Sequence, residues 1–133
     1  MVLTSRSWIA ALSVMFGVLL LASSVVAEEP KVSTYAPAAD LANQADQFIK
    51  ELDKAVADEA AFKDAGDKIA KDSNTLIIVA LALGLNDQDS KYKKSAGALM
   101  KAAQDVAAAK DYASAKKAVD AVKDAADGKG EAS

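Results

Sequence analysis

The residues that could carry chemistry in this chain are carboxylates and lysines, because the sequence contains no cysteine and no histidine. Thiolate and imidazole groups are the usual ligands of zinc and the usual nucleophiles and bases of covalent catalysis. Covalent attachment of a c-type haem also requires a Cys-x-x-Cys-His motif. The composition therefore predicts a protein that is not an enzyme and has no catalytic, metal-binding or cofactor-binding residues.

A charged stretch near the middle of the chain contains two carboxylates at helical spacing. Its members are Asp64, Asp67, Lys68, Lys71 and Asp72. Asp64 and Asp67 are three residues apart and would share one face of a helix, where two carboxylates could exchange protons or hold a hard cation. Lysines are interleaved with them, so we interpret the stretch as a solvated helix face. The pair Asp120 and Asp124 is interpreted in the same way.

The segment 86–90 (NDQDS) resembles the start of a calcium-binding loop. An EF-hand loop beginning at Asp87 would need glycine at its sixth position and glutamate at its twelfth. Those positions are Tyr92 and Ala98, so we interpret the segment as a solvated turn between helices. Three basic residues that follow are expected to neutralise this turn locally: Lys91, Lys93 and Lys94.

Residues 1–27 are typical of a secretory signal peptide. Arg6 precedes an apolar run over residues 8–22, and small residues then lead to Ala27, after which we predict cleavage. The alternative is a retained membrane anchor, because residues 7–27 are uncharged and long enough to span a bilayer. Cleavage removes one charge and changes the formal net charge from −3 to −4. We expect an exported protein, periplasmic or secreted, that binds neither nucleic acid nor, once cleaved, a membrane.

The remaining chain is predicted to be all-α. A polar leader covers residues 28–37, and a C-terminal tail covers residues 128–133. Apolar residues recur at alternating spacings of three and four over four predicted helices, at about 38–57, 59–85, 91–109 and 112–126. Positions predicted to face the core include Phe48, Gly66, Leu76 and Tyr92. The common period and the short connections predict an up-down-up-down antiparallel four-helix bundle over residues 38–127.

The late part of the second predicted helix is apolar on every side. Ile78, Leu81 and Leu85 lie opposite the core-facing positions, on a face that is charged or polar one or two turns earlier. A helix of this kind must be covered at its apolar end.

A second copy of the chain is the first candidate cover, which predicts a homodimer with Ile78, Leu81 and Leu85 as the self-association face. The leader is the second candidate, through Val32 and Tyr35. A hydrophobic ligand or another protein is the third.

Two stretches, 69–76 (IAKDSNTL) and 80–112, together with four alanine-rich helices after an export signal, resemble the cytochrome c-prime family. The likeness covers residues 38–126. It implies a four-helix bundle that pairs through its first two helices. The segment matching the family's haem-attachment motif, 122–126 (VKDAA), contains neither cysteine nor histidine, and the first-helix methionine of some relatives has no counterpart. The resemblance therefore implies a haem-less relative; a generic alanine-rich bundle without this kinship is the alternative.

These features predict an exported, non-enzymatic helical-bundle protein that acts as an interaction or structural module. The alternative function is a haem-binding electron-transfer protein of the cytochrome c-prime type. Without the attachment motif, its haem would have to be held non-covalently by Met100, a tyrosine or a lysine.

Overall fold

The computed structural model describes residues 27–130. The chain divides into two units, residues 1–30 and residues 31–133. In the first unit the described residues, 27–30, have no regular secondary structure. The rest of the predicted signal peptide, residues 1–26, lies outside the described residues, as do residues 131–133 of the predicted tail.

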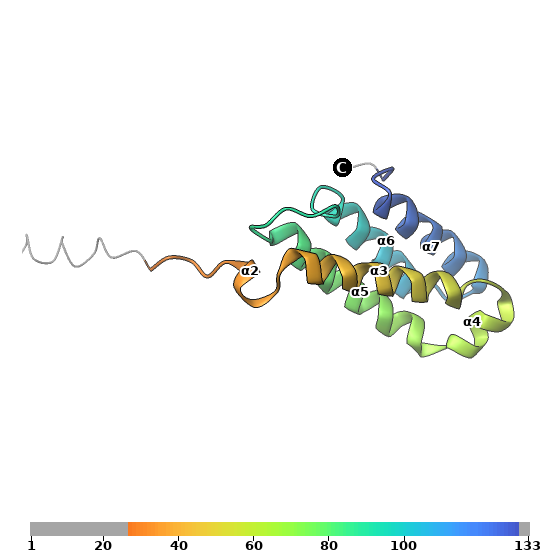
Figure 1. The fold of residues 1–133 in the computed structure, drawn as a ribbon. Helices are drawn as coiled ribbons and strands as arrows, with labels where there is room; N and C mark the ends of the chain where they lie inside the picture. The colour runs from red at the N-terminus through yellow and green to blue at the C-terminus, as the bar shows by residue number, and fades with distance from the viewer. Residues whose placement is uncertain (1–26, 131–133) are drawn as a thin grey trace, which may run out of the picture. The chain divides into compact units, whose positions relative to one another are not determined.

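The second unit is all-helical over its described residues, as the sequence predicted (Figure 1). Its elements are α2 (Val32–Tyr35), α3 (Ala38–Ala55), α4 (Glu59–Ala65), α5 (Asp67–Leu85), α6 (Ala96–Ala108) and α7 (Tyr112–Ala126). Helix α5 packs on α3 and on α6, α6 packs on α7, and α3 contacts α7 more sparsely. The short α4 lies where α3 and α5 are joined.

The second predicted helix, 59–85, is wrong as a single element. Gly66 separates α4 from α5 and has φ +48°, a left-handed backbone conformation that favours glycine. Gly66 is exposed and does not face the core. Its N–H donates to the carbonyl of Phe62, closing α4, and its own carbonyl accepts from Ile69, opening α5. Because the spacing of three and four continues across Gly66, the sequence pattern hid this break.

The third predicted helix is shorter than expected. Helix α6 begins at Ala96, and residues 91–95 form a hydrogen-bonded turn instead of helix. The last predicted helix matches α7, with Asp111 as its N-cap: the Asp111 side chain accepts a hydrogen bond from the backbone N–H of Ser114 at 2.8 Å. The predicted polar leader contains one turn of helix, α2.

The core follows the predicted spacing closely. The largest fully buried side chains come from α3, α5, α6 and α7 and from the residue that ends α3: Leu52, Leu76, Leu83, Leu99, Val56, Val106, Val119 and Val122. Tyr92 is buried as predicted, although it lies in a turn. Phe48 is only half-buried and packs against the edge of the core, whereas Leu52, one turn later, is fully buried. Alanines fill many remaining core positions, so the helices approach closely.

Candidate functional site

The most unusual surface of the described residues is a stripe of large aliphatic side chains along α5. Ile78 is 67% exposed, Leu81 45% and Leu85 66%. Their spacing of three and four places them on one helix face, opposite the buried Leu76 and Leu83. The structure thus places the three predicted residues together, and none of residues 31–130 covers them. We call Ile78, Leu81 and Leu85 the α5 stripe.

The polar residues one and two turns earlier continue the same face. Asp67, Lys71 and Asn74 precede Ile78 at spacings of four, three and four, and all three are exposed. The face of α5 is therefore polar in its first half and apolar in its second half. Large aliphatic side chains that are grouped on an exposed helix face are more informative than single exposed ones.

Within the second unit, residues 31–37 of the leader do not cover the α5 stripe. Tyr35 is 79% exposed and Val32 is half-buried. Residues 31–38 dock instead on the turn that follows Leu85. These residues therefore lie at the C-terminal end of α5, and the outward face of the stripe stays exposed.

Four hydrogen bonds hold the leader on that turn. Ser33 donates twice to the carboxylate of Asp87, from its backbone N–H at 2.9 Å and from its hydroxyl at 2.7 Å. Asn86 donates to the carbonyl of Ala36 at 2.8 Å, and the N–H of Ala38 donates to Oε1 of Gln88 at 3.0 Å. The hydroxyl and N–H of Ser33 lower the pKa of the Asp87 carboxyl. The segment resembling a calcium loop is thus a docking point for the leader.

Asn86 is the buried centre of this turn. It is 2% exposed, and besides binding Ala36 its side-chain oxygen accepts from the N–H of Gln88 at 3.0 Å. Its backbone carbonyl accepts from the Lys93 ammonium at 2.7 Å. The prediction that residues 86–90 form a solvated turn is wrong for Asn86. An asparagine directly after an apolar run that ends a helix was the available signal.

A second polar cluster joins the 91–95 turn to α3. Lys91 donates to both oxygens of Asp46, at 2.8 and 2.7 Å, and the Tyr92 hydroxyl donates to Oδ1 of the same carboxylate. The Lys91 ammonium also lies 4.8 Å from the centre of the Tyr92 ring. Lys91 was expected to neutralise the preceding acidic turn, but it pairs across the fold with Asp46.

The surroundings of this cluster shift two pKa values in opposite directions. Partial burial raises the pKa of Asp46, but the hydrogen bonds from Lys91 and Tyr92 and the Lys91 charge outweigh it, so the pKa is lowered overall. Burial and the hydrogen bond to Asp46 raise the pKa of Tyr92. The cluster is therefore an ionised carboxylate held by a cation and a neutral phenol, which suits a structural link between elements.

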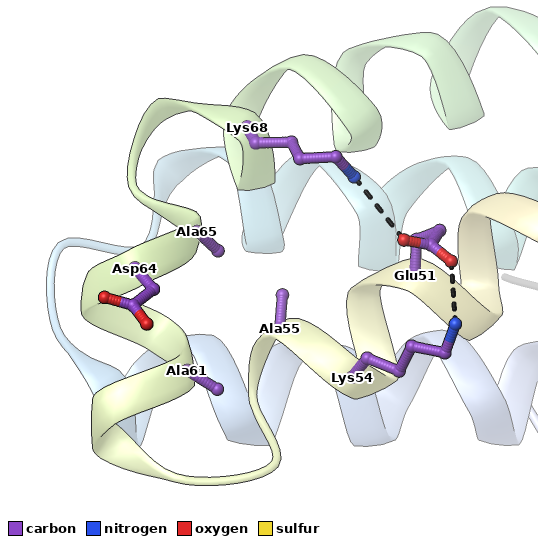
Figure 2. A pocket seen from close by; sticks show the side chains of 7 residues that line it. All are labelled: Glu51, Lys54, Ala55, Ala61, Asp64, Ala65 and Lys68. Carbon is purple, nitrogen blue, oxygen red and sulfur yellow. Dashed lines mark hydrogen bonds and ion pairs between the residues drawn. The ribbon is translucent and has the colours of Figure 1, made fainter.

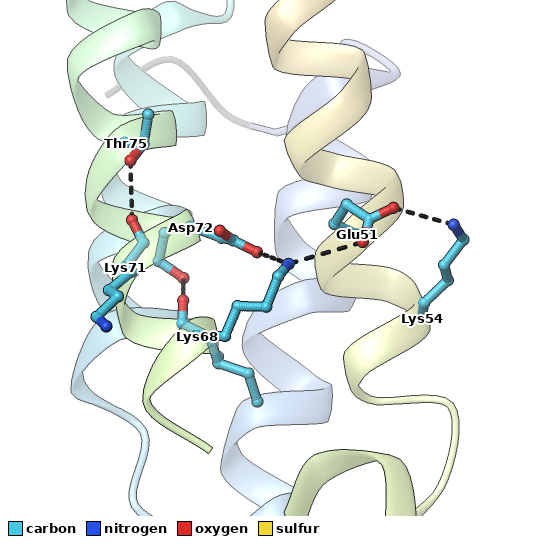
Figure 3. Close-up of polar contacts among 8 residues, drawn as sticks. Glu51, Lys54, Lys68, Lys71, Asp72 and Thr75 are labelled. Carbon is cyan, nitrogen blue, oxygen red and sulfur yellow. Dashed lines mark hydrogen bonds and ion pairs between the residues drawn. The ribbon is translucent and has the colours of Figure 1, made fainter. Parts of the chain in front are cut away.

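Most of the charged stretch at the start of α5 is exposed, as predicted, but the Asp72 side chain is largely buried and the geometry differs from the prediction. Asp64 and Asp67 do not share a helix face, because the break at Gly66 puts them on α4 and α5. Lys68 lies between two carboxylates, 2.5 Å from Asp72 and 3.6 Å from Glu51 of α3 (Figure 3). A hydrogen bond to Asp72 raises the pKa of Lys68, and one from Lys54 lowers the pKa of Glu51.

A shallow pocket of about 320 Å³ lies beside these ion pairs. Its residues come from the end of α3, from α4 and from the start of α5: Glu51, Lys54, Ala55, Ala61, Asp64, Ala65 and Lys68. Figure 2 shows the methyl groups of Ala55 on α3 and of Ala61 and Ala65 on α4, with charged side chains around them. Glu51 already pairs with both lysines of the rim, at 3.0 Å for Lys54 and 3.6 Å for Lys68. The pocket therefore offers a ligand small apolar contacts and few uncommitted charges.

The stretch 122–126 of α7 offers no side chain for covalent attachment of a haem. In α7, Val122 and Ala125 are buried in the helix core, and the stretch 122–126 has no thiol or imidazole. Met100 is half-buried on α6. Among residues 27–130, no group of three or more carboxylates is arranged to hold a metal ion. Over the same residues, no helix has both the length and the apolar character needed to cross a membrane.

Comparison with known proteins adds no assignment. No family model matches the chain, and no similar curated protein or solved structure was found. The α5 stripe is therefore the candidate functional site on the strength of its geometry.

Proposed function

We propose that this protein is an exported, non-enzymatic helical bundle that acts as an interaction or structural module and self-associates through the α5 stripe. The observation that carries this proposal is the exposure of Ile78, Leu81 and Leu85 at 67, 45 and 66% on a single helix face. Burying a large aliphatic side chain stabilises a protein by about 1.5–3 kcal/mol relative to leaving it exposed. A contact that covers the stripe is thus favourable for each of its three residues.

A symmetric pair of copies is the simplest cover. In a twofold dimer the same patch is used twice, so one contact buries both copies of Ile78, Leu81 and Leu85. Polar residues at the start of the same face, Asp67 and Lys71, would limit the contact to the apolar half of α5. This division gives the contact a defined position along the helix.

The bundle in this proposal has up-down-up-down connectivity formed by α3, α5, α6 and α7. Contacts between successive long helices, and a further contact between α3 and α7, support a closed four-helix arrangement. The pairing of Lys68, at the start of α5, with Glu51, near the end of α3, supports an antiparallel arrangement of these two helices. Helix α4 is then an insertion in the first connection.

The test is sedimentation of the purified protein at micromolar concentration. We expect a dimer for the unsubstituted chain and a folded monomer for the double variant Ile78→Lys with Leu81→Asp. Ala113→Lys with Ala121→Asp is the matched control, because both alanines are exposed on α7 and the charge change is the same. A monomeric unsubstituted chain at that concentration would refute self-association.

Export is proposed on the strength of residues 1–27. The intact mass of the exported protein should match a chain that begins at Glu28. This chain lacks Trp8, the single tryptophan of the sequence. Retention of residues 1–27 would favour the membrane-anchor alternative.

Kinship with cytochrome c-prime is proposed in its haem-less form. The absence of cysteine and histidine from residues 122–126 supports loss of the prosthetic group. Protein co-expressed with haem-attachment machinery should show no Soret absorption. Stoichiometric haem would favour the electron-transfer alternative instead.

A further inference from the structure

Helix α4 is weakly attached to the rest of the bundle. None of its residues is buried, whereas each of the four long helices has at least five buried residues. Within residues 31–130 its side chains form no hydrogen bond or ion pair with another helix, since Lys63 pairs only with Glu59 of α4 itself, at 3.2 Å. Its packing contacts are sparse and are mainly with α3. A segment with few buried contacts can open at a lower free energy than the whole fold.

The helical backbone is interrupted on both sides of α4. Asp58, before α4, is extended, with φ −151° and ψ 174°. Gly66, after α4, has φ +48°, and glycine changes between positive and negative φ at little cost. Residues at the ends of helices are the usual hinges of moving segments, because they absorb changes in φ and ψ. Movement of α4 therefore requires no change inside α3 or α5.

Phe62 supplies the aromatic contact that holds α4 to α7. The ring centroids of Phe62 and Tyr112 are 6.1 Å apart and their planes are inclined by 60°, an arrangement that stabilises aromatic pairs. Phe62 is half-buried, and together with Ala65 it packs against the core. Opening of α4 would separate the two rings and uncover this end of the core.

We infer that α4 is a hinged flap over the end of the core, that it opens between Asp58 and Gly66 while the four long helices stay folded, and that the contact of Phe62 with Tyr112 is its latch. Ala61 and Ala65 of α4 form part of the lining of the 320 Å³ pocket, so opening of the flap also widens that pocket. A helix of seven residues is not stable in water without tertiary contacts. The N–H groups of α4 therefore become accessible to solvent each time the flap opens.

The experiment measures native-state hydrogen exchange by NMR in the exported protein. The reporters are the N–H groups of Phe62 and Gly66, which donate to the carbonyls of Asp58 and Phe62, and the N–H of Leu76 within α5. We expect both α4 reporters to have lower protection factors than Leu76. Phe62→Ala should lower the protection factors of α4 by about tenfold or more, because the latch is lost. Lys63→Ala is the matched control on the same helix, and it should leave them unchanged.

Leu99→Val separates opening of the flap from unfolding of the bundle. Leu99 is fully buried on α6, and loss of one buried methylene group should lower the protection factor of Leu76 by about fourfold. The α4 reporters should keep theirs, because the open flap still contains the folded long helices. Equal protection of α4 and Leu76, or an equal loss in Leu99→Val, would overturn the flap. Unchanged protection of α4 in Phe62→Ala would overturn the latch.

Discussion

The hydroxyl of Tyr92 donates a hydrogen bond to the carboxylate of Asp46, a residue 46 positions earlier in the chain. Tyr92 is buried in the 91–95 turn, and Asp46 lies on α3. This bond, together with the pair between Lys91 and Asp46, ties the only long irregular connection among the described helices to α3. The turn is therefore held by the tertiary structure and not by helix propensity.

Tyr92→Phe tests that bond. The phenyl ring can keep its packing, while Asp46 loses one donor but retains Lys91 and access to water. We expect the free energy of unfolding to fall by about 1 kcal/mol, the usual net value of an intramolecular hydrogen bond. Chemical denaturation measures it, and the same substitution in an Asp46→Asn background should have a smaller effect. Equal effects in both backgrounds would contradict the bond.

The lowered pKa of Asp46 predicts a loss of stability in acid. A carboxyl whose pKa is below its ordinary value of 3.8 in the folded state stabilises the fold above that pH, and this contribution disappears as the pH falls through the folded pKa. Asp87 and Glu51 also have lowered pKa values and contribute to the same loss of stability in acid. The contribution of Asp46 is therefore isolated by comparing Asp46→Asn with the unsubstituted protein. We expect this variant to be less stable than the unsubstituted protein at neutral pH, with the difference shrinking below about pH 4. A difference independent of pH would argue against an ionised Asp46 in the link.

Leu52→Ala should reveal the register of α3. Leu52 is fully buried, and truncation of a buried leucine costs about 2–5 kcal/mol. Phe48→Ala should cost less than the roughly 3–5 kcal/mol expected for a fully buried phenylalanine, because Phe48 is half-buried. Lys50→Ala, exposed on the same helix, is the control and should change stability by less than about 0.5 kcal/mol. Urea denaturation measures the loss in the free energy of unfolding for each of the three variants. A large loss for Lys50→Ala would place α3 in a different register.

Asn86→Ala should release the leader. The substitution leaves the Ala36 carbonyl and the Gln88 N–H without their partner, at a cost of about 1–3 kcal/mol for buried polar groups. Hydrogen exchange should accelerate at the N–H groups of Ser33 and Ala38, whose acceptors lie on the same turn. Asn43→Ala, at an exposed position of α3, should leave both rates unchanged. Unchanged rates in Asn86→Ala would show that the leader is held without this side chain.

Gly66→Ala should weaken the junction of α4 and α5. At φ +48° an alanine is strained, and the free energy of unfolding should fall by about 1 kcal/mol or more. Gly97→Ala is the control, because a Cβ atom there would meet nothing within 4 Å and replacing a helical glycine by alanine should raise stability. Melting curves followed by circular dichroism compare the two. Greater stability of Gly66→Ala would indicate that α4 and α5 can join into one helix.

The sequence by itself determined the helical class, the core spacing of the long helices and the outward direction of Ile78, Leu81 and Leu85. These features depend on the period of a helix, which a local pattern of apolar residues expresses directly. The N-cap at Asp111 was also predictable, since its acceptor and donor are three residues apart.

Only the tertiary structure decided where the helices are interrupted and which contacts hold the interrupting segments in place. The apolar spacing runs through Gly66 unchanged, so the break there, which lets α4 contact α3, does not follow from the pattern. Asn86 and Asp46 have partners 50 and 46 positions away, respectively. The packing of whole helices brings such distant residues within hydrogen-bond distance. The local spacing of apolar residues contains no information about these contacts.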